Sequence, residues 1–277
     1  MNILFWNAGI GKKCKYTEQH KDRIEKLLVE LIIENKVDIV VLAEYELDLL
    51  KICNSLAVRG FLYKLGKSIN SRCRVKLLLK EELNYEYYKD PEYYFIVKIT
   101  NIVGYELLLG GVHFPSKLNS AALNGRNRIA DDMVRDLQDL TKKVIILGDF
   151  NSNPYEDIML GFDYFHALPY SEVVQQRNSR ISYGMERRIF YNPMWNYIND
   201  FSNPHGTYYI DTNDYIYTGY NILDQALFSA NIIDDLENKK ITIITEVNGK
   251  KLVDNFNRPN KECYSDHLPI FFTIKGE

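Results

Sequence analysis

Short apolar runs recur along the whole chain and predict a protein that is rich in β-strands. Most of the runs are apolar almost without interruption, as expected for strands that are covered on both faces. They lie at residues 3–6, 38–43, 75–80, 93–99, 105–112, 144–148, 224–230, 241–247 and 268–274. We expect each run to form one strand of a buried sheet.

Two longer segments instead follow the period of an amphipathic helix. The first covers residues 18–35, begins after the suitable N-cap Thr17, and has an apolar stripe at Ile24, Leu27, Leu28, Leu31 and Ile32. The second covers residues 121–140, with a stripe at Ile129, Met133, Leu137 and Leu140. A weaker pattern predicts a third helix at about 46–57.

The order of these elements predicts an α/β sandwich in which helices cover sheets. Neither a short repeat, a low-complexity tract nor a linker interrupts the sequence, so we expect a single domain over residues 1–277. The least regular part is residues 157–222, which is dense in tyrosine, phenylalanine, asparagine and arginine.

Composition narrows the class of protein. A hydrophobic content of 46%, a charged content of 26% and a net charge of −3 describe an ordinary globular protein and exclude a surface that is basic throughout. The four cysteines, at 14, 53, 73 and 263, lack both C-x-x-C and zinc spacing and predict reduced thiols. The segment MNILFWNAGI resembles neither a signal peptide nor a membrane span, so we expect a cytoplasmic protein without stable membrane association.

Polar side chains stand at the ends of the predicted strands, and this is where we expect a site. In VIILGDFNSNPYE, residues 144–156, Asp149 and Asn151 would share one face of an extended strand while Phe150 turns to the core. Taken alone, the same stretch is equally typical of a polar turn. The other strand-end groups are Asn7, Glu44, His113, Asp224, Asp266 and His267. Strands that deliver such groups one after another place them on one rim of the scaffold.

These segments resemble the ordered motifs of a known superfamily. They are WNAG (6–9), LAEYE (42–46), GVHFPS (111–116), GDFNSNP (148–154), LDQALFS (223–229) and YSDHLPI (264–270). In this order they are similar to the motifs of the endonuclease/exonuclease/phosphatase superfamily, the DNase I-like fold. The resemblance implies a four-layer α/β/β/α sandwich, with two mixed β-sheets packed face to face and helices outside. It also implies a metal-dependent phosphodiesterase or phosphomonoesterase.

The resemblance further implies the metal ligands. Glu44 would be the principal ligand of a Mg²⁺ or Mn²⁺ ion, Asn7 would lie beside it, and Asp266 would be a second carboxylate near the metal. Carboxylate and amide oxygens suit a hard dication. Such an ion would polarise a phosphoryl oxygen and stabilise the leaving oxyanion.

Catalytic roles follow from the resemblance by matched position. Asp149 would orient or deprotonate the attacking water, and Asn151 would hold the scissile phosphate. His267, aligned by Asp224, would contact the phosphate as a general acid–base group. His113 would stabilise the charge of the phosphorane.

The chain departs from the family pattern near residues 70–82. Family members of the DNase type have an acid that pairs with the residue matching His113, but here Glu81 and Glu82 come only after the strand, so the acid stays unassigned. The same region contains Arg72, Arg74 and Lys76. We interpret these cations as a solvated strand edge, with substrate phosphate binding as the alternative.

Several other residues are candidates for substrate binding. They are Arg126 near the start of the second helix, Arg180 and Arg187 within the irregular segment, and Trp195 in FYNPMW. Guanidinium groups match phosphate and aromatic rings stack on bases. The alternatives are a surface position for the arginines and core packing for the tryptophan.

The substrate class stays open at the level of sequence. The signatures of the inositol polyphosphate phosphatase branch are absent, and NYEYYKDPEYYF (84–95) is too charged for an apolar membrane-binding hairpin. We therefore predict a nuclease with a DNA or RNA substrate. A phosphatase or phosphodiesterase for small molecules or lipid headgroups is the alternative, and a non-catalytic binding module is a weaker one. A protein partner stays unassigned.

Overall fold

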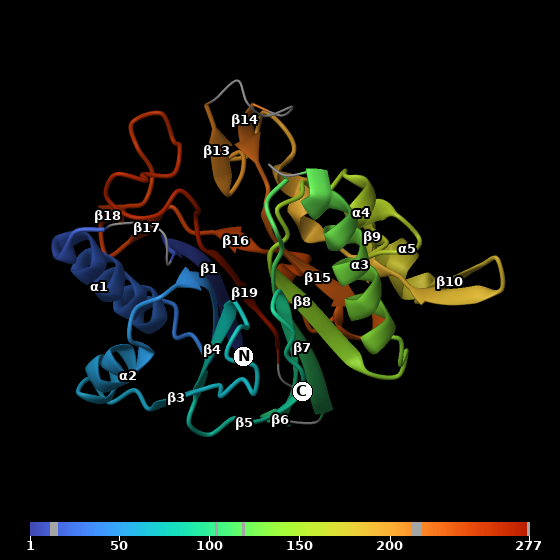
Figure 1. Cartoon of the computed structure of the whole chain (residues 1–277), viewed down its shortest axis with the longest axis horizontal. Coiled ribbons are helices and arrows are strands. Elements are labelled where there is room, and N and C mark those ends of the chain that lie inside the picture. Colours follow the sequence, from blue (N-terminus) through green and yellow to red (C-terminus); the bar gives the residue numbers. More distant parts are fainter. Residues whose placement is uncertain (12–15, 103–104, 118–119, 212–217, 276–277) are drawn as a thin grey trace.

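Two β-sheets pack face to face, and helices cover their outer sides (Figure 1). The computed structural model describes residues 1–11, 16–102, 105–117, 120–211 and 218–275. The resulting four-layer arrangement of helix, sheet, sheet and helix is the sandwich that the sequence predicts.

The first sheet has six strands in the order β16-β19-β1-β2-β4-β3. They are β1 (Asn2–Ile10), β2 (Ile39–Tyr45), β3 (Tyr63–Leu65), β4 (Val75–Lys80), β16 (Thr242–Ile243) and β19 (Ile270–Thr273). The sheet is mixed, because β1 runs parallel to β2 and antiparallel to β19. Helices α1 (Glu18–Glu34) and α2 (Leu49–Ala57) lie on its outer side.

The second sheet has seven strands in the order β5-β6-β7-β8-β15-β12-β9. They are β5 (Asn84–Lys89), β6 (Tyr94–Ile102), β7 (Tyr105–His113), β8 (Lys143–Asp149), β9 (Ala167–Leu168), β12 (Phe190–Tyr191) and β15 (Asp224–Ser229). This sheet is also mixed, with β7 and β8 as a parallel pair. Helices α3 (Ser120–Asp136), α4 (Asp157–Leu160) and α5 (Ser171–Gln176) lie on its outer side.

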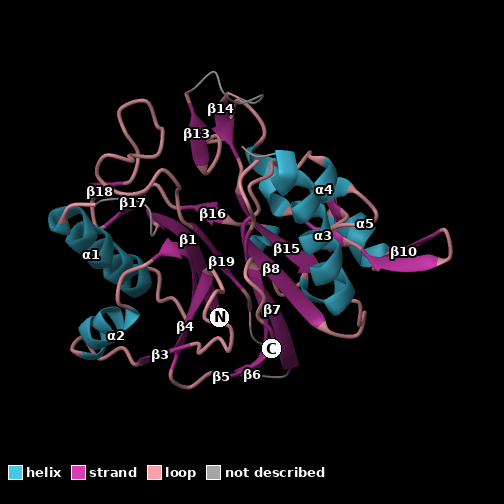
Figure 2. Ribbon diagram, viewed as in Figure 1, coloured by secondary structure: helices cyan, strands magenta, loops and turns pink. Residues whose placement is uncertain are grey.

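The described residues also form three short hairpins and three short 3₁₀ helices (Figure 2). The hairpins are β10 (Ser179–Ser182) with β11 (Met185–Arg188), β13 (Tyr208–Ile210) with β14 (Gly219–Asn221), and β17 (Glu246–Val247) with β18 (Lys250–Lys251). The 3₁₀ turns are η1 (Pro193–Tyr197), η2 (Ala230–Ile232) and η3 (Glu237–Lys239). Residues 157–222 therefore hold many short elements, which explains why their sequence lacks a sustained period.

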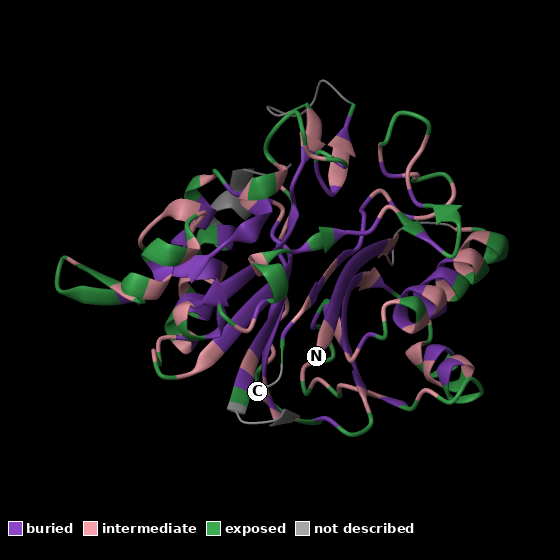
Figure 3. Ribbon diagram, turned by 180° about the vertical axis from the view of Figure 1, so that it is seen from behind, coloured by how far each residue is buried: buried purple, intermediate pink, exposed green. Residues whose placement is uncertain are grey.

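The central strands are buried on both faces, as their continuous apolar runs predict (Figure 3). In β8, Ile145 and Leu147 belong to the core between the sheets, whereas Val144 and Ile146 pack in a second core beneath α3. Alternation of strand side chains thus supplies both cores from one run.

The predicted helices are confirmed, with one difference in length. Thr17 caps α1 by accepting a hydrogen bond from the backbone N–H of His20, at 3.2 Å, and the five residues of the predicted stripe are buried. Asp48 caps α2 in the same way through Leu50. The helix predicted to reach residue 140 ends at Asp136, because the Asp139 carboxylate accepts hydrogen bonds from Thr141 and starts a turn instead.

Two expectations about strands are wrong. The run 241–247 is not one strand but splits into β16 and β17. Strand β16 pairs with β19 of the six-stranded sheet, whereas β17 pairs with β18, so the chain leaves the sheet after Ile243. Strand β4 is not an edge, because it lies between β2 and β3, and Arg74 beside it forms an ion pair with Glu92 at 2.5 Å.

Among the described residues, no helix is both long and apolar enough to span a bilayer. Cys53, Cys73 and Cys263 are free thiols, as predicted, and Cys14 lies outside the described residues. The segment 84–95 forms β5 and the start of β6.

Gly148 allows β7 and β8 to lie close together immediately before the predicted catalytic aspartate. Its φ is +151°, and a Cβ at this position would lie 2.0 Å from the carbonyl oxygen of Val112. Because that oxygen belongs to the backbone, the contact cannot be relieved by a side-chain rotation. We expect Gly148→Ala to lower the free energy of unfolding by about 3 kcal/mol or more, measured by urea denaturation.

Gly125 in α3 provides the matched control. A Cβ there meets no atom within 4 Å, and the position is exposed and helical. We expect Gly125→Ala to raise stability by about 1 kcal/mol. Equal effects of the two substitutions would contradict the steric role of Gly148.

Candidate active site

Strand register places three predicted catalytic residues side by side in the seven-stranded sheet. His113 at the end of β7 lies opposite Asp149 at the end of β8, and Asp149 lies opposite Asp224 at the start of β15. The three residues are buried. A single row across three neighbouring strands therefore forms one wall of the candidate site.

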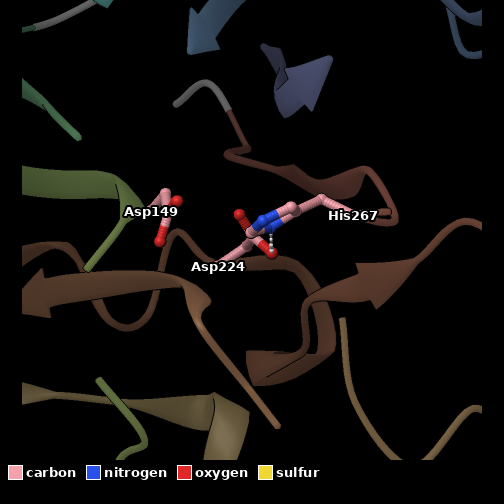
Figure 4. Close-up of side chains that lie close together, drawn as sticks. All are labelled: Asp149, Asp224 and His267. Carbon is pink, nitrogen blue, oxygen red and sulfur yellow. Dashed lines mark hydrogen bonds and ion pairs between the residues drawn. The ribbon is translucent and has the colours of Figure 1, made fainter. Parts of the chain in front are cut away.

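His267 reaches this row from the other sheet, just before β19. Its Nδ1 lies 2.8 Å from Oδ2 of Asp224 (Figure 4). Burial alone would lower the pKa of His267, but the carboxylate of Asp224, with Asp149 and Asp266 nearby, raises that pKa to about 10. The imidazole is thus held as a cation by a buried partner, with Nδ1 donating to the carboxylate.

Asp149 is fixed by hydrogen bonds on both carboxylate oxygens. Oδ2 accepts from Nδ2 of Asn7 at 2.9 Å and from Nδ2 of Asn151 at 3.3 Å, and Oδ1 accepts from the backbone N–H of Asn151 at 2.8 Å. Burial, together with the nearby charge of Asp224, raises the pKa of Asp149. A carboxylate with a raised pKa is a better proton acceptor.

Asn151 reaches Asp149 by a turn and not by strand alternation. Its φ is +48°, in the left-handed region, and β8 already ends at Asp149. The expectation that an extended backbone would put both side chains on one face is therefore wrong in its geometry, although the two side chains do meet. Phe150 between them is fully buried, as predicted.

Glu44 lies across from the row, at the end of β2. Its Oε1 is 3.4 Å from Nε2 of His113, and the same nitrogen is 3.9 Å from Oδ2 of Asp149. The hydrogen bond to His113 is the largest of the effects that lower the pKa of Glu44. Nδ1 of His113 is buried and has no hydrogen-bond partner among the described residues, so the acid that the resemblance implies beside His113 stays unassigned.

Four residues that the sequence analysis does not assign hold the site in place. The indole N–H of Trp6 donates to the backbone oxygen of His267. The ring centre of Tyr208 lies 4.5 Å from the ring centre of His267. The hydroxyl of Ser265 donates to the backbone oxygen of Asn7 and accepts from the backbone N–H of His267. Thr207 accepts from the backbone N–H of Asp224. Ser265 lies inside the motif YSDHLPI, but no local pattern marks Thr207 or Tyr208.

Two glycines lie beside the predicted metal ligands. A Cβ on Gly11 would lie 3.4 Å from Oε2 of Glu44, and one on Gly9 would lie 3.4 Å from Oδ1 of Asp266. Glu44 keeps 40% of its side chain exposed. The carboxylate oxygens of Glu44 and Asp266 and the amide oxygen of Asn7 are of the kinds that a hard divalent cation prefers.

A second group could in principle hold a metal ion. Ligand atoms of Asp149, Asp224 and His267 lie within 4.8 Å of one another. However, Nδ1 of His267 is engaged with Asp224, and the raised pKa keeps this imidazole protonated, whereas metal ligation needs a neutral ring. The Glu44 side of the site is therefore the better fit.

The predicted substrate-binding residues are scattered. Arg126 is buried, and its Nη2 donates to the carbonyl oxygens of Phe150 and Asn151, at 3.0 Å each, and to the hydroxyl of Ser152. Arg126 thus holds the loop at residues 150–152, which directly follows Asp149. Arg187 is also buried and pairs with Asp131 at 3.0 Å. Arg180 is exposed on the β10–β11 hairpin, which projects from the side of the molecule (Figure 1). Trp195 is half-buried in η1.

Solved structures share this fold at low sequence identity. D. rerio TDP2, complexed with single strand DNA product, has a TM-score of 0.59 and 16% identity, with 99% of this chain and 98% of that chain covered. The human Nocturnin catalytic domain, with bound sulfate anion, has a TM-score of 0.56 and 15% identity, with 100% and 94% covered. The endonuclease domain of TRAS1, a telomere-specific non-LTR retrotransposon, has a TM-score of 0.52 and 14% identity, with 99% and 97% covered.

No protein-family model and no curated protein matches the sequence. The structural likeness covers nearly the whole chain and shows the DNase I-like sandwich fold.

The buried contacts of Arg126 lead to a stability prediction. Arg126→Leu removes the donor for three acceptors of the 150–152 loop and leaves them without that partner. We expect a loss of about 2–4 kcal/mol in the free energy of unfolding. Arg128→Leu on the same helix is the control, since its side chain is 85% exposed and a change within about 0.5 kcal/mol is expected. Thermal or urea unfolding measures both, and equal losses would contradict the support role.

Proposed function

We propose that this chain, which has the DNase I-like fold, is a divalent-metal-dependent phosphodiesterase that hydrolyses DNA or RNA. The observation that carries the proposal is the meeting of two separate pairs at one rim. Asp224 pairs with His267, which lies just before β19, and Asp149 pairs with Asn7 in β1, so each pair joins the seven-stranded sheet to the side of the six-stranded sheet. A buried acid, a cationic imidazole and an oxygen-rich ligand set are the groups that phosphoryl transfer needs.

Asp149 orients the attacking water and accepts its proton. Its raised pKa favours that transfer, and the hydrogen bonds from Asn7 and Asn151 hold its two oxygens in fixed directions. The amide of Asn151 is itself held by the carbonyl oxygen of Phe114, at 2.9 Å. We assign this amide to the scissile phosphate, for which it would give up its longer hydrogen bond, the one to Oδ2 of Asp149 at 3.3 Å.

His267 contacts the phosphate from the opposite side of the row. Because Nδ1 donates to Asp224, its other nitrogen is the one that can donate to a phosphate oxygen or to the leaving group. Asp224 is then a positioning residue, which fixes the ring and keeps it charged. His113, between Glu44 and Asp149, offers Nε2 to the charge that develops on the phosphorane.

Glu44, Asn7 and Asp266 would hold the metal ion, with Mg²⁺ or Mn²⁺ as the proposed species. When bound, such an ion polarises a phosphoryl oxygen and stabilises negative charge on the leaving oxygen. The lowered pKa of Glu44 keeps its carboxylate ionised and available as a ligand.

The comparisons support the choice of a polymeric substrate. One similar structure is a TDP2 with a single-stranded DNA product, and another is an endonuclease domain. Arg180, Arg187 and Trp195 remain proposed substrate contacts, although Arg187 would first have to leave Asp131. Arg126 is assigned to loop support instead. A cytoplasmic location is part of the proposal.

The first test is cleavage of supercoiled plasmid, single-stranded DNA and structured RNA in Mg²⁺, Mn²⁺ or EDTA. We expect metal-dependent cleavage that falls to background in Glu44→Ala and in His267→Ala, because each removes a group that contacts metal or phosphate. Glu18→Ala, on the exposed start of α1, is the control and should keep full activity. Circular dichroism confirms that the variants are folded. Retained cleavage in either site variant would refute these assignments.

Asp224→Asn tests the positioning of the imidazole. The substitution keeps the size of the side chain but removes the buried charge that holds His267 as a cation. We expect kcat to fall by about 10³- to 10⁴-fold, by analogy with the loss of the aspartate in other His–Asp pairs, while KM changes little. An unchanged kcat with a raised KM would show that Asp224 acts in substrate binding instead.

A further inference from the structure

The contacts at the rim of the candidate active site follow the strand order of both sheets. Strands β19, β1, β2 and β4 are consecutive in the six-stranded sheet, and β15, β8, β7 and β6 are consecutive in the seven-stranded sheet. Each step along the two sheets adds one side-chain contact across the rim. In this order the contacts join His267 to Asp224, Asn7 to Asp149, Glu44 to His113, and Arg74 to Tyr93. The proposed chemistry uses every contact of this series except the last.

Arg74 lies beside the proposed metal ligand Glu44 in the strand order. Strands β2 and β4 are antiparallel neighbours whose pairing ends at Ala43 and Val75, and Glu44 and Arg74 are the next residues beyond that pair. The lowered pKa of Glu44 owes most to the hydrogen bond with His113, and the positive charge of Arg74 is among its further causes. The guanidinium is therefore close enough to act on the Glu44 carboxylate.

Contacts with the segment before β6 hold Arg74 in this position. Its guanidinium carbon lies 4.6 Å from the ring centre of Tyr93, and its backbone N–H donates to the carbonyl oxygen of Glu92 at 2.9 Å. The carbonyl oxygen of Tyr93 in turn accepts from the backbone N–H of His113, also at 2.9 Å. Both ring and backbone contacts thus keep the cation at the rim.

Glu92 offsets the charge of Arg74 only in part. Its Oε1 lies 2.5 Å from Nη2 of Arg74, and the side chains of Arg74 and Glu92 are 46% and 39% exposed. An ion pair that is this open to water is weak, so each of its charges still acts on its surroundings.

A cation at this point opposes the binding of a divalent cation at Glu44. The guanidinium of arginine is not deprotonated in proteins, so this repulsion is permanent. Sites for hard dications tune their affinity through the charge of their ligands. A positive charge beside Glu44 therefore cancels part of the attraction that the carboxylates of Glu44 and Asp266 would provide.

We propose that Arg74 lowers the affinity of the Glu44 site for its divalent cation, and that Glu92 moderates this effect by screening Arg74. The proposal rests on the proposed function, which places the metal ion at Glu44. It assigns to the Arg74–Glu92 pair a role in setting how much metal the protein needs, apart from any contact with the substrate.

The test measures Mn²⁺ binding without turnover. Electron paramagnetic resonance of free Mn²⁺ gives the dissociation constant at low ionic strength in the absence of nucleic acid. Arg74→Gln removes the cation, Arg74→Lys keeps it, and Glu92→Gln removes the screening acid. Glu44→Ala identifies the binding that belongs to the site. Circular dichroism confirms that the variants are folded.

Lys98→Gln is the matched control. Lys98 pairs with Glu106 at 2.5 Å, with side chains 38% and 42% exposed, so the pair resembles that of Arg74 and Glu92. Lys98 lies within β6, about 16 Å from Tyr93 at the strand rise of about 3.3 Å per residue. That separation exceeds the Debye length of about 10 Å at 0.1 M salt.

We expect Arg74→Gln to lower the dissociation constant of Mn²⁺ by about 3- to 10-fold, the size of a Coulomb interaction on the order of 8 Å through water. Glu92→Gln should raise the constant by about 2- to 5-fold, for the same reason. Arg74→Lys and Lys98→Gln should stay within about 2-fold of the wild type, and all differences should vanish near 1 M salt. The opposite signs separate a charge effect from structural damage, which would weaken binding in both variants.

Equal or weaker Mn²⁺ binding in Arg74→Gln than in the wild type would overturn the proposal while leaving the nuclease assignment in place. If that variant instead combined an unchanged Mn²⁺ constant with a raised KM for oligonucleotides, Arg74 would be a substrate contact and the proposal would again be wrong. Absence of any Mn²⁺ binding that depends on Glu44 would contradict the metal site of the proposed function, and the role of Arg74 would fall with it.

Discussion

The site depends on the packing of the two sheets against each other. Asn7 and His267 belong to the six-stranded side, whereas Asp149 and Asp224 belong to the seven-stranded side. Apolar side chains between the sheets set the distance across which these polar groups must meet. Hydrogen bonds of 2.8 and 2.9 Å then form across the rim. A change in sheet separation of even 1 Å would break both pairs, so the core determines the chemistry.

Within one sheet, register has the same importance. A shift of β8 by one residue would turn Asp149 to the opposite face and bring Phe150 to the rim. Gly148 maintains the register, because only a residue without Cβ can lie so close to Val112. Arg126 acts from behind by holding the carbonyl oxygens of the 150–152 loop. Gly148 and Arg126 therefore contribute both to stability and to the geometry of the candidate site.

The proposed roles of the acids differ because their surroundings differ. Asp149 is buried and has a raised pKa, which suits proton acceptance. Glu44 is partly exposed and has a lowered pKa, which suits a metal ligand. Asp224 is buried beside a cationic ring and serves to hold it. Three carboxylates, two on neighbouring strands of one sheet and one on the other sheet, are thereby suited to three proposed functions without a change in residue type.

The sequence by itself determined the two long helices, the main strands and the set of polar residues at their ends, because period and capping are local properties. It could not determine that Arg126 would turn inward, that residues 241–247 would leave the sheet after Ile243, or that Asn151 would reach Asp149 through a left-handed turn. These outcomes depend on which acceptors and cavities distant segments provide. Only the tertiary structure decides which distant segments contact each other, because no local sequence pattern links them.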